Sequence, residues 1–183
     1  MEKELTKKGK HLAFLLRHDK EAFEKGLIDK NGWRNVSELI KQHGYTKQLL
    51  EEITDTNDKK RYEFNSDKSK IRARQGHSIP VDVDLKEMVP PNVLFHGTAS
   101  RFLDSIFDKG LVSGDRLYVH LSNDEETAKK VGSRHGEPCV LRVDAKQMHE
   151  DGYKFYLSNN NVWLTKKVPN GYLSIFSFYK DDR

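Results

Sequence analysis

The segment at positions 68–78 combines residue types that could bind an anion. It reads Lys68-Ser69-Lys70-Ile71-Arg72-Ala73-Arg74-Gln75-Gly76-His77-Ser78. Alternate side chains of an extended strand share one face, so the cations at positions 68, 70, 72 and 74 would line one side while Ile71 and Ala73 face a core. The pattern fits a solvated edge strand, which often carries Lys and Arg, and it also fits an anion site.

Further candidates stand at the ends of apolar segments or beside glycines: His96 after positions 93–95, His120 within 117–122, and Arg134 within 132–136. Each alone has an ordinary explanation, as a core histidine or a surface arginine. Arg17 and His18 could likewise only favour the C-terminal end of a helix. Taken together, these arginines, histidines and neighbouring hydroxyls favour an anion, because the arginine fork binds phosphate with two hydrogen bonds.

Several other chemistries have no matching motif. The sequence contains neither the P-loop nor the dinucleotide-binding glycine pattern. It also lacks the paired Cys or His spacing of a zinc site and the nucleophile elbow of hydrolases. We therefore expect no metal ion.

Composition bounds the remaining possibilities. The chain has 183 residues, 33% of them charged, with a formal net charge of +4, which allows one domain or two small lobes and agrees with a polyanionic partner. The one cysteine, Cys139, excludes a disulfide framework and favours a reducing compartment. The charged N-terminus does not resemble a signal peptide, and no apolar run is long enough for a membrane. We expect a cytoplasmic monomer.

The first half predicts three helices and a β-hairpin. Helical spacing of leucines predicts a helix over residues 3–17. A capping-box pattern, Asn35-Val36-Ser37-Glu38, starts a second helix that Gly44 ends, and a third buries Leu49, Leu50 and Ile53. Alternation at 62–64 and from Lys68 predicts the hairpin. This order is typical of a winged helix, which we assign to residues 1–88.

The second half predicts an α+β lobe over residues 89–183. The double proline at 90–91 marks the boundary, because proline continues neither a helix nor a central strand. Strands are expected at 93–95, 117–121, 139–143, 162–164 and 172–178. Helices are expected at 100–109, with Phe102, Ile106 and Phe107 inward, and from the Asn123–Glu126 cap to about residue 131. Short strands with two helices favour a mainly antiparallel, split sheet.

These segments, in order, resemble the NAD-dependent RNA (tRNA) 2′-phosphotransferases. The matching segments are Leu15-Leu16-Arg17-His18, Ile71-Arg72-Ala73 with Gln75-Gly76-His77-Ser78, Leu94-Phe95-His96-Gly97-Thr98, Tyr118-Val119-His120-Leu121-Ser122, Val131-Gly132 with Arg134-His135-Gly136, and Val162-Trp163-Leu164. The resemblance runs from about Leu5 to Tyr172. Each motif alone is weak, but six in order across both lobes are specific.

The resemblance implies a winged-helix RNA lobe followed by an ADP-ribosyltransferase-like lobe that binds NAD. It implies removal of an internal RNA 2′-phosphate, as left at a tRNA splice junction. The 2′-phosphate would attack the nicotinamide ribose to give an ADP-ribosylated 2′-phosphate. The ribose 2″-hydroxyl would then release 2′-OH RNA and ADP-ribose 1″,2″-cyclic phosphate. NAD and 2′-phosphorylated RNA are the implied partners.

The resemblance also implies residue roles. Arg17, His18, Arg72 and Arg134 would engage the 2′-phosphate and the developing charge. The implied NAD-binding residues are His96, Gly97, Thr98, His120 and Ser122, and Gln75, His77 and His135 would contact substrate. Val162 stands where many ADP-ribosyltransferases have a glutamate, and Asn161 stands where the family often has glycine. Alternatives are ADP-ribosylation of a nucleic-acid terminal phosphate or of a protein, and a non-catalytic RNA-binding module.

Overall fold

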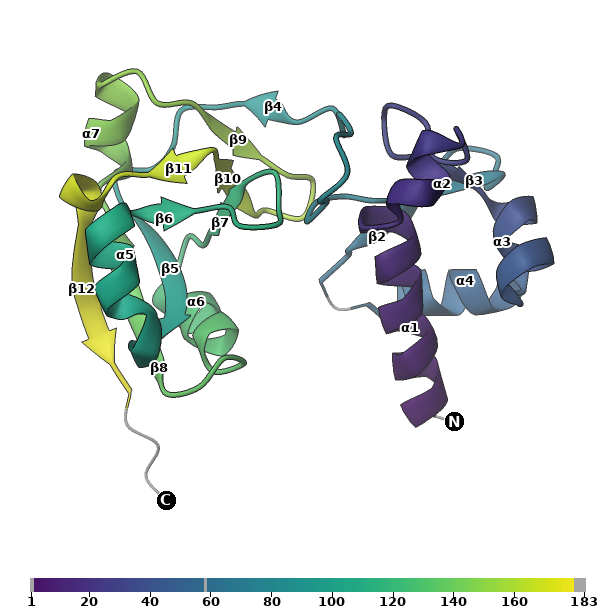
Figure 1. The fold of residues 1–183 in the computed structure, drawn as a ribbon, viewed down its shortest axis with the longest axis horizontal. Helices are drawn as coiled ribbons and strands as arrows, with labels where there is room; N and C mark the ends of the chain where they lie inside the picture. Colours follow the sequence, from purple (N-terminus) through teal and green to yellow (C-terminus); the bar gives the residue numbers. More distant parts are fainter. Residues whose placement is uncertain (1, 58, 180–183) are drawn as a thin grey trace. The chain divides into compact units, whose positions relative to one another are not determined.

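The computed structural model describes residues 2–57 and 59–179, and the chain divides into two compact units (Figure 1). Unit 1 comprises Met1–Asp84 together with Asp115–Leu117, and unit 2 comprises Leu85–Gly114 and Tyr118–Arg183. The chain thus leaves unit 1 after Asp84 and returns to it briefly over 115–117, whereas the sequence predicted a single crossing after residue 88. The short return brings a loop of the second half of the chain into unit 1.

Unit 1 contains four helices and a small antiparallel sheet among its described residues. The elements are α1 (Glu2–Arg17), α2 (Lys20–Glu24), β1 (Arg34–Asn35), α3 (Val36–His43), α4 (Lys47–Asp55), β2 (Tyr62–Phe64) and β3 (Lys70–Ala73). The sheet order is β1-β3-β2, and β2 and β3 form the predicted hairpin. The three predicted helices are confirmed, whereas α2 was not predicted because its five residues are too few for a periodic pattern.

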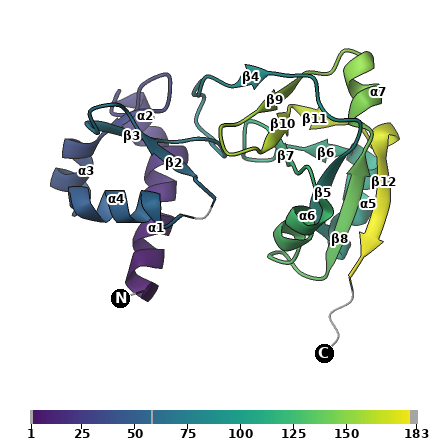
Figure 2. The same cartoon turned by 180° about the vertical axis from the view of Figure 1, so that it is seen from behind.

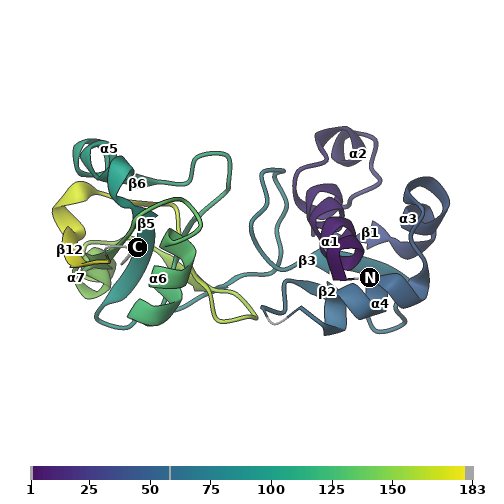
Figure 3. The ribbon, with the colours of Figure 1, turned by 90° about the horizontal axis from the view of Figure 1, so that it is seen from below.

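The core of unit 1 is formed by side chains of α1, α3, α4 and the hairpin, whose elements Figure 3 shows side by side. The leucines of α1 at positions 12, 15 and 16 are buried against Leu39 of α3 and Leu50 of α4. From the sheet, Ile71 and Ala73 are fully buried, as predicted. Gly44 ends α3 in a left-handed conformation, with φ of 65°, which its lack of a Cβ permits.

Two local predictions in unit 1 are wrong. Asn35 precedes α3, but its side chain forms no capping hydrogen bond, and both carboxylate oxygens of Glu38 accept from Arg34 instead of completing the box. The row of cations does not lie on one strand, because β3 begins only at Lys70. Lys68 occupies the preceding turn with φ of 56°, and Arg74 follows the strand.

Unit 2 contains short strands and helices (Figure 2). In the part of the chain described, every pair of neighbouring strands in this unit is antiparallel. The elements are β4 (Lys86–Glu87), β5 (Leu94–Ala99), η1 (Ser100–Phe102), α5 (Leu103–Lys109), β6 (Leu111–Val112), β7 (Val119–Leu121), α6 (Glu125–Gly132), β8 (Pro138–Val143), α7 (Ala145–Glu150), β9 (Phe155–Leu157), β10 (Trp163–Thr165), β11 (Lys167–Val168), η2 (Asn170–Tyr172) and β12 (Leu173–Phe178). The sheets have the orders β4-β9-β10-β7, β12-β8-β5 and β11-β6. The expectation of a mixed chain with antiparallel pairing is confirmed.

Three features of unit 2 differ from the sequence predictions. β5 extends through His96, so the His-Gly-Thr segment lies within a strand rather than after it. Phe102 is 41% exposed instead of facing the core, because the first turn of the predicted helix is a separate 3₁₀ turn. The helix α7 was not predicted. Across residues 2–57 and 59–179, none of the helices has the length and apolar composition required to cross a lipid bilayer.

Candidate functional site

The C-terminal end of α1 is where the first predicted site residues lie. α1 ends at Arg17, and the backbone N–H of Ser78 donates to the Arg17 carbonyl at 2.9 Å. His18 Nδ1 lies 3.0 Å from Ser78 Oγ. Gly76, with φ of 87°, allows the 75–78 segment to turn there, and a Cβ on it would lie 3.6 Å from the Arg17 guanidinium. The strand-end segment and the helix end therefore form one cluster.

This cluster contains buried polar atoms that have no hydrogen-bond partner among the described residues. They are Arg17 Nε and Nη2, Arg74 Nε, Gln75 Oε1 and His77 Nε2. Buried polar groups in native proteins are almost always paired, so such a concentration needs a functional or structural reason. We name Arg17, His18, Gln75 and His77 the α1-end cluster. Within it, the donors Arg17 Nε and Nη2 and the acceptor Gln75 Oε1 are buried and have no hydrogen-bond partner in the described chain.

The electrostatics of the α1-end cluster favour an anion. Burial lowers the pKa of Arg17 to about 10, with Arg61 and Arg116 acting in the same direction and Tyr62 opposing them, so Arg17 remains charged at neutral pH. Burial, and then the nearby Arg17 charge, lower the pKa of His18 and take that of His77 to about 3. Both histidines are therefore neutral at pH 7, and each ring has one nitrogen that donates a hydrogen bond and one that accepts a hydrogen bond.

The loop 115–117 adds a cation that sequence reasoning missed. Leu117 N–H donates to the His77 carbonyl at 3.0 Å, which fixes the loop to the cluster. Arg116 lowers the pKa of both Arg17 and His18, whereas Asp115 opposes this effect at His18. The available signal was the position of Arg116 in a polar turn just before the strand that carries His120.

Arg72 has a different environment from Arg17, although the two residues share a predicted role. Its Nε donates to Glu63 at 2.7 Å, and its Nη1 reaches Asp84 and the Asn31 carbonyl, each at 3.2 Å. Its guanidinium also lies 4.3 Å from the Trp33 ring centroid. Carboxylates thus neutralise this arginine inside unit 1, and its contacts hold the hairpin to the preceding turn.

The other cations of the predicted row also have carboxylate partners. Lys68 lies 2.8 Å from Glu51, and Lys70 lies 3.5 Å from Asp29. Arg74 lies 3.6 Å from Glu63. β3 is the central strand of the sheet β1-β3-β2, so it is not the solvated edge strand that the pattern allowed. The cations of the row are nevertheless ion-paired, apart from the unpaired Arg74 Nε.

In unit 2 the structure brings His96, His120 and Ser122 together where β5 approaches β7. His96 Nδ1 lies 3.0 Å from the His120 carbonyl, which can only accept, so Nδ1 carries the proton. Burial lowers the pKa of His96, so its Nε2 is an acceptor at neutral pH. Ser122 and Phe95 exchange backbone hydrogen bonds of 2.8 and 2.9 Å, which hold the two strands together.

Gly97 and Thr98 have a packing role that sequence reasoning did not separate from ligand binding. A Cβ on Gly97 would lie 1.6 Å from the Ala128 carbonyl of α6, and one on Gly132 would lie 2.7 Å from the Thr98 carbonyl. α6 therefore lies directly on the backbone of β5, which only glycines permit. Thr98 is 6% exposed. The close approach by itself accounts for the glycine at position 97.

The remaining predicted residues lie after α6 and before β10. Arg134 and His135 are exposed in the turn that follows α6, where their N–H groups donate to Val131 and Gly132 carbonyls at 3.3 and 3.0 Å. Asn161 has φ of 60°, which agrees with its place where glycine is common in the resembled family. Within the described ranges no cluster of His, Cys, Asp and Glu could hold a metal ion.

The chain is similar to known proteins over most of its length. The sequence pattern of the RNA 2′-phosphotransferase, Tpt1 / KptA family matches residues 3–167. A probable RNA 2′-phosphotransferase of Acaryochloris marina is 48% identical over 177 residues, which cover 94% of this chain and 97% of the relative. One of Flavobacterium johnsoniae is 49% identical over 174 residues, covering 92% and 94%. The chain belongs to the RNA 2′-phosphotransferase, Tpt1 / KptA family.

Proposed function

We propose that the protein transfers an internal RNA 2′-phosphate, such as that of a tRNA splice junction, to NAD. The products would be 2′-OH RNA, nicotinamide and ADP-ribose 1″,2″-cyclic phosphate. The phosphate oxygen displaces nicotinamide at the ribose C1″, and the ribose 2″-hydroxyl then attacks phosphorus and expels the RNA 2′-oxygen. Family membership supports the phosphotransferase activity, and the use of NAD is our inference from the matching motifs.

The observation that carries the proposal is the pair of unpartnered, buried Arg17 donors, Nε and Nη2. A phosphate dianion would accept hydrogen bonds from both, and such charge-assisted bonds are roughly twice as strong as neutral ones. His18 stands next to Arg17 and is positioned by Ser78. We assign it the proton transfer that accompanies loss of the RNA 2′-oxygen.

The first step needs no general base, because the attacking phosphate oxygen is already an anion. An apolar Val162 in place of a glutamate agrees with this chemistry, since a carboxylate would repel the phosphate. NAD supplies a good leaving group, the cationic nicotinamide. The protein's task is therefore to position the reactants and to stabilise charge.

For NAD binding we propose His96, His120 and Ser122 of unit 2. The Nε2 acceptor of neutral His96 suits a ribose hydroxyl donor, because its Nδ1 is held by the His120 carbonyl. We keep Gly97 and Thr98 as backbone neighbours of this group. Arg134, exposed after α6, is our candidate for charge that develops on the phosphoryl oxygens.

We also propose that unit 1 is a winged-helix RNA lobe and unit 2 an ADP-ribosyltransferase-like lobe. The order of three main helices and a hairpin supports the first assignment. The antiparallel sheets β4-β9-β10-β7 and β12-β8-β5 support the second. Arg72 would then serve the RNA lobe by holding its hairpin, with phosphate contact as a secondary role.

The test is an assay on a short RNA that carries one internal 2′-phosphate. We expect release of nicotinamide and of the cyclic phosphate only when both NAD and this RNA are present. A stable ADP-ribosylated RNA or protein, without cyclic phosphate, would replace the proposal with ADP-ribosyl transfer. RNA that stays unchanged in the presence of NAD, with the protein folded, would reduce it to a binding module.

A further inference from the structure

One face of α1 carries exposed residues that neither the core nor the α1-end cluster uses. Lys3, Lys7, Lys10 and Phe14 are all exposed. They are spaced i, i+4, i+7 and i+11, so they lie along one side of the helix. Leucines on the other side are buried in the core of unit 1. We name these four residues the α1 stripe.

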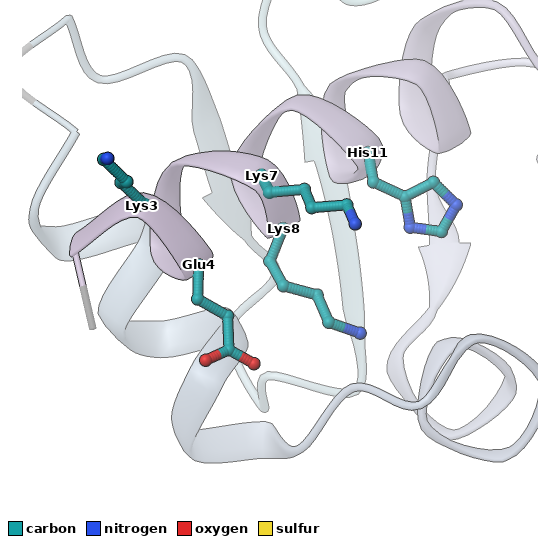
Figure 4. A pocket seen from close by; sticks show the side chains of 5 residues that line it. All are labelled: Lys3, Glu4, Lys7, Lys8 and His11. Carbon is teal, nitrogen blue, oxygen red and sulfur yellow. The ribbon is translucent and has the colours of Figure 1, made fainter.

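The lysines of the stripe differ from the cations of the hairpin. In the part of the chain that the structure describes, the ion pairs include none with Lys3, Lys7 or Lys10, whereas every cation of the 68–74 row has a carboxylate within 4.0 Å. Figure 4 shows the neighbouring hollow, whose lining comprises Lys3, Glu4, Lys7, Lys8 and His11. With one carboxylate among these residues, the surface complements a polyanion.

Phe14 connects the stripe to the α1-end cluster. Its side chain is 51% exposed, and its ring centroid lies 6.5 Å from that of His18, one helical turn further on. An aromatic ring left in water costs free energy unless it has a partner. A ring beside a phosphate site is well placed to stack on a nucleobase next to that phosphate.

We propose that the α1 stripe binds the single-stranded RNA that flanks the 2′-phosphate, with Phe14 stacking on a base and the three lysines contacting backbone phosphates. The inference rests on the proposed function, because it takes Arg17 and His18 as the place of the 2′-phosphate. From Lys7 to His18 the helix rises about 16 Å. That distance accommodates several nucleotides, and a single strand leaves bases unstacked and free to meet the ring.

The charge part of the proposal is tested by the salt dependence of binding. The probe is a fluorescent ten-nucleotide single-stranded RNA with one internal 2′-phosphate, and the protein is the full chain. The variant Lys3→Gln/Lys7→Gln/Lys10→Gln should reduce the slope of log affinity against log salt by about 2, because each phosphate contact on a single strand contributes about 0.7. The matched control is Lys25→Gln/Lys41→Gln/Lys47→Gln, which removes the same charge from other exposed positions of unit 1.

The stacking part is tested with Phe14→Ala, which should weaken binding about tenfold while leaving the salt slope unchanged. Phe14→Trp should retain the affinity, because it keeps an aromatic face. The control is Phe102→Ala, an exposed phenylalanine of unit 2, which should bind like the wild type. Circular dichroism verifies that each variant keeps its helix content.

The outcomes separate this inference from the proposed function. Equal slopes for the two lysine triples, or an unchanged affinity of Phe14→Ala, would overturn the α1 stripe even if the enzyme is active. Loss of binding to anionic phospholipid vesicles in the stripe variant, with RNA binding intact, would also overturn it. If the wild type releases no nicotinamide, the proposed function fails, whereas the binding series still decides whether the stripe binds RNA.

Discussion

Two arginines of unit 1, the partly buried Arg17 at the end of α1 and the buried Arg34 at the start of β1, have opposite surroundings. Arg34 is 1% exposed and satisfied by neighbours: Nε and Nη2 donate to Glu38, and Nη1 donates to Asp19 and to the Leu15 carbonyl. Arg17 has two buried donors without a partner in the described chain.

The difference separates arginines that hold the fold from one whose buried donors have no partner in the described chain and which the proposed function assigns to the 2′-phosphate. A buried charge costs free energy unless carboxylates and hydrogen bonds offset it. Arg34 meets that condition, and Arg72 meets it through Glu63 and Asp84. Arg17 does not, so the fold tolerates an unfavourable group whose charge and donors a phosphate would satisfy.

The comparison predicts the largest stability loss at Arg34. Arg34→Ala should lower the free energy of unfolding by about 3–5 kcal/mol, because it leaves Glu38 and Asp19 partly buried without their cation. Urea denaturation measures this loss. Arg101→Ala, at an exposed arginine of unit 2, is the control and should change stability little. If the Arg34→Ala protein is as stable as the wild type, a buried arginine that is paired with carboxylates does not necessarily stabilise the fold.

Arg17 should show the reverse pattern. Arg17→Ala should reduce the rate of the proposed NAD-dependent reaction at least about a hundredfold, in line with loss of a transition-state donor. Its stability should be equal to or higher than that of the wild type, because an unsatisfied buried charge is removed. Single-turnover kinetics and denaturation on the same preparation give both values. Arg17→Lys should recover little activity, since it lacks the planar fork.

Arg72 provides the intermediate case. Arg72→Ala should lower the free energy of unfolding by about 2–3 kcal/mol, because Glu63 loses its main partner while the exposed Asp84 loses little. Any loss of activity should exceed that of Arg74→Ala. Equal losses of activity for the two variants, measured in the same assay, would show that the sequence placed the phosphate contact at the wrong arginine.

The pH dependence of stability at His77 reports the burial and the positive charge of the α1-end cluster. Burial lowers the pKa of His77 from 6.5 in the unfolded chain to about 3 in the folded protein. Between these two pH values the unfolded state binds more protons than the folded state, so stability falls as the pH falls through 6.5. From pH 7 to pH 5 His77 should account for about 2 kcal/mol of lost stability. The variant His77→Gln, denatured at both pH values, should lack this contribution to the loss of stability. The variant His149→Gln, at an exposed histidine, should show the full wild-type loss.

The smallest effect is expected at Lys68. Its pair with Glu51 is on the surface, with side chains 52% and 33% exposed. Lys68→Ala should leave the free energy of unfolding and the activity essentially unchanged, because solvent screens an exposed pair. A loss of RNA affinity in the binding assay would restore the cation row as part of the RNA surface.

Much of the fold followed from local pattern. The α1 helix and the hairpin appear where periodicity predicted them, because their apolar residues repeat with the period of the element, and β8 appears at the apolar run predicted as a strand. Two short helices, α2 and α7, gave no such signal over five and six residues. The predicted capping box at Asn35 does not form: the Asn35 side chain makes no capping hydrogen bond, and Glu38 pairs with Arg34. A local sequence signal can therefore fail where a charged side chain pairs with a residue outside the motif.

The candidate site divides in the same way. The sequence alone determined the family and the residue types at each motif: Arg17 and His18 after a helix, His96 and His120 in strands. Only the tertiary structure decided which arginine is neutralised, because the partners of Arg72 stand 9 and 12 residues away and the Arg34 bond to Leu15 spans 19. The pattern of charges along the chain does not predict these contacts, because they form only when segments that are distant in the sequence pack together.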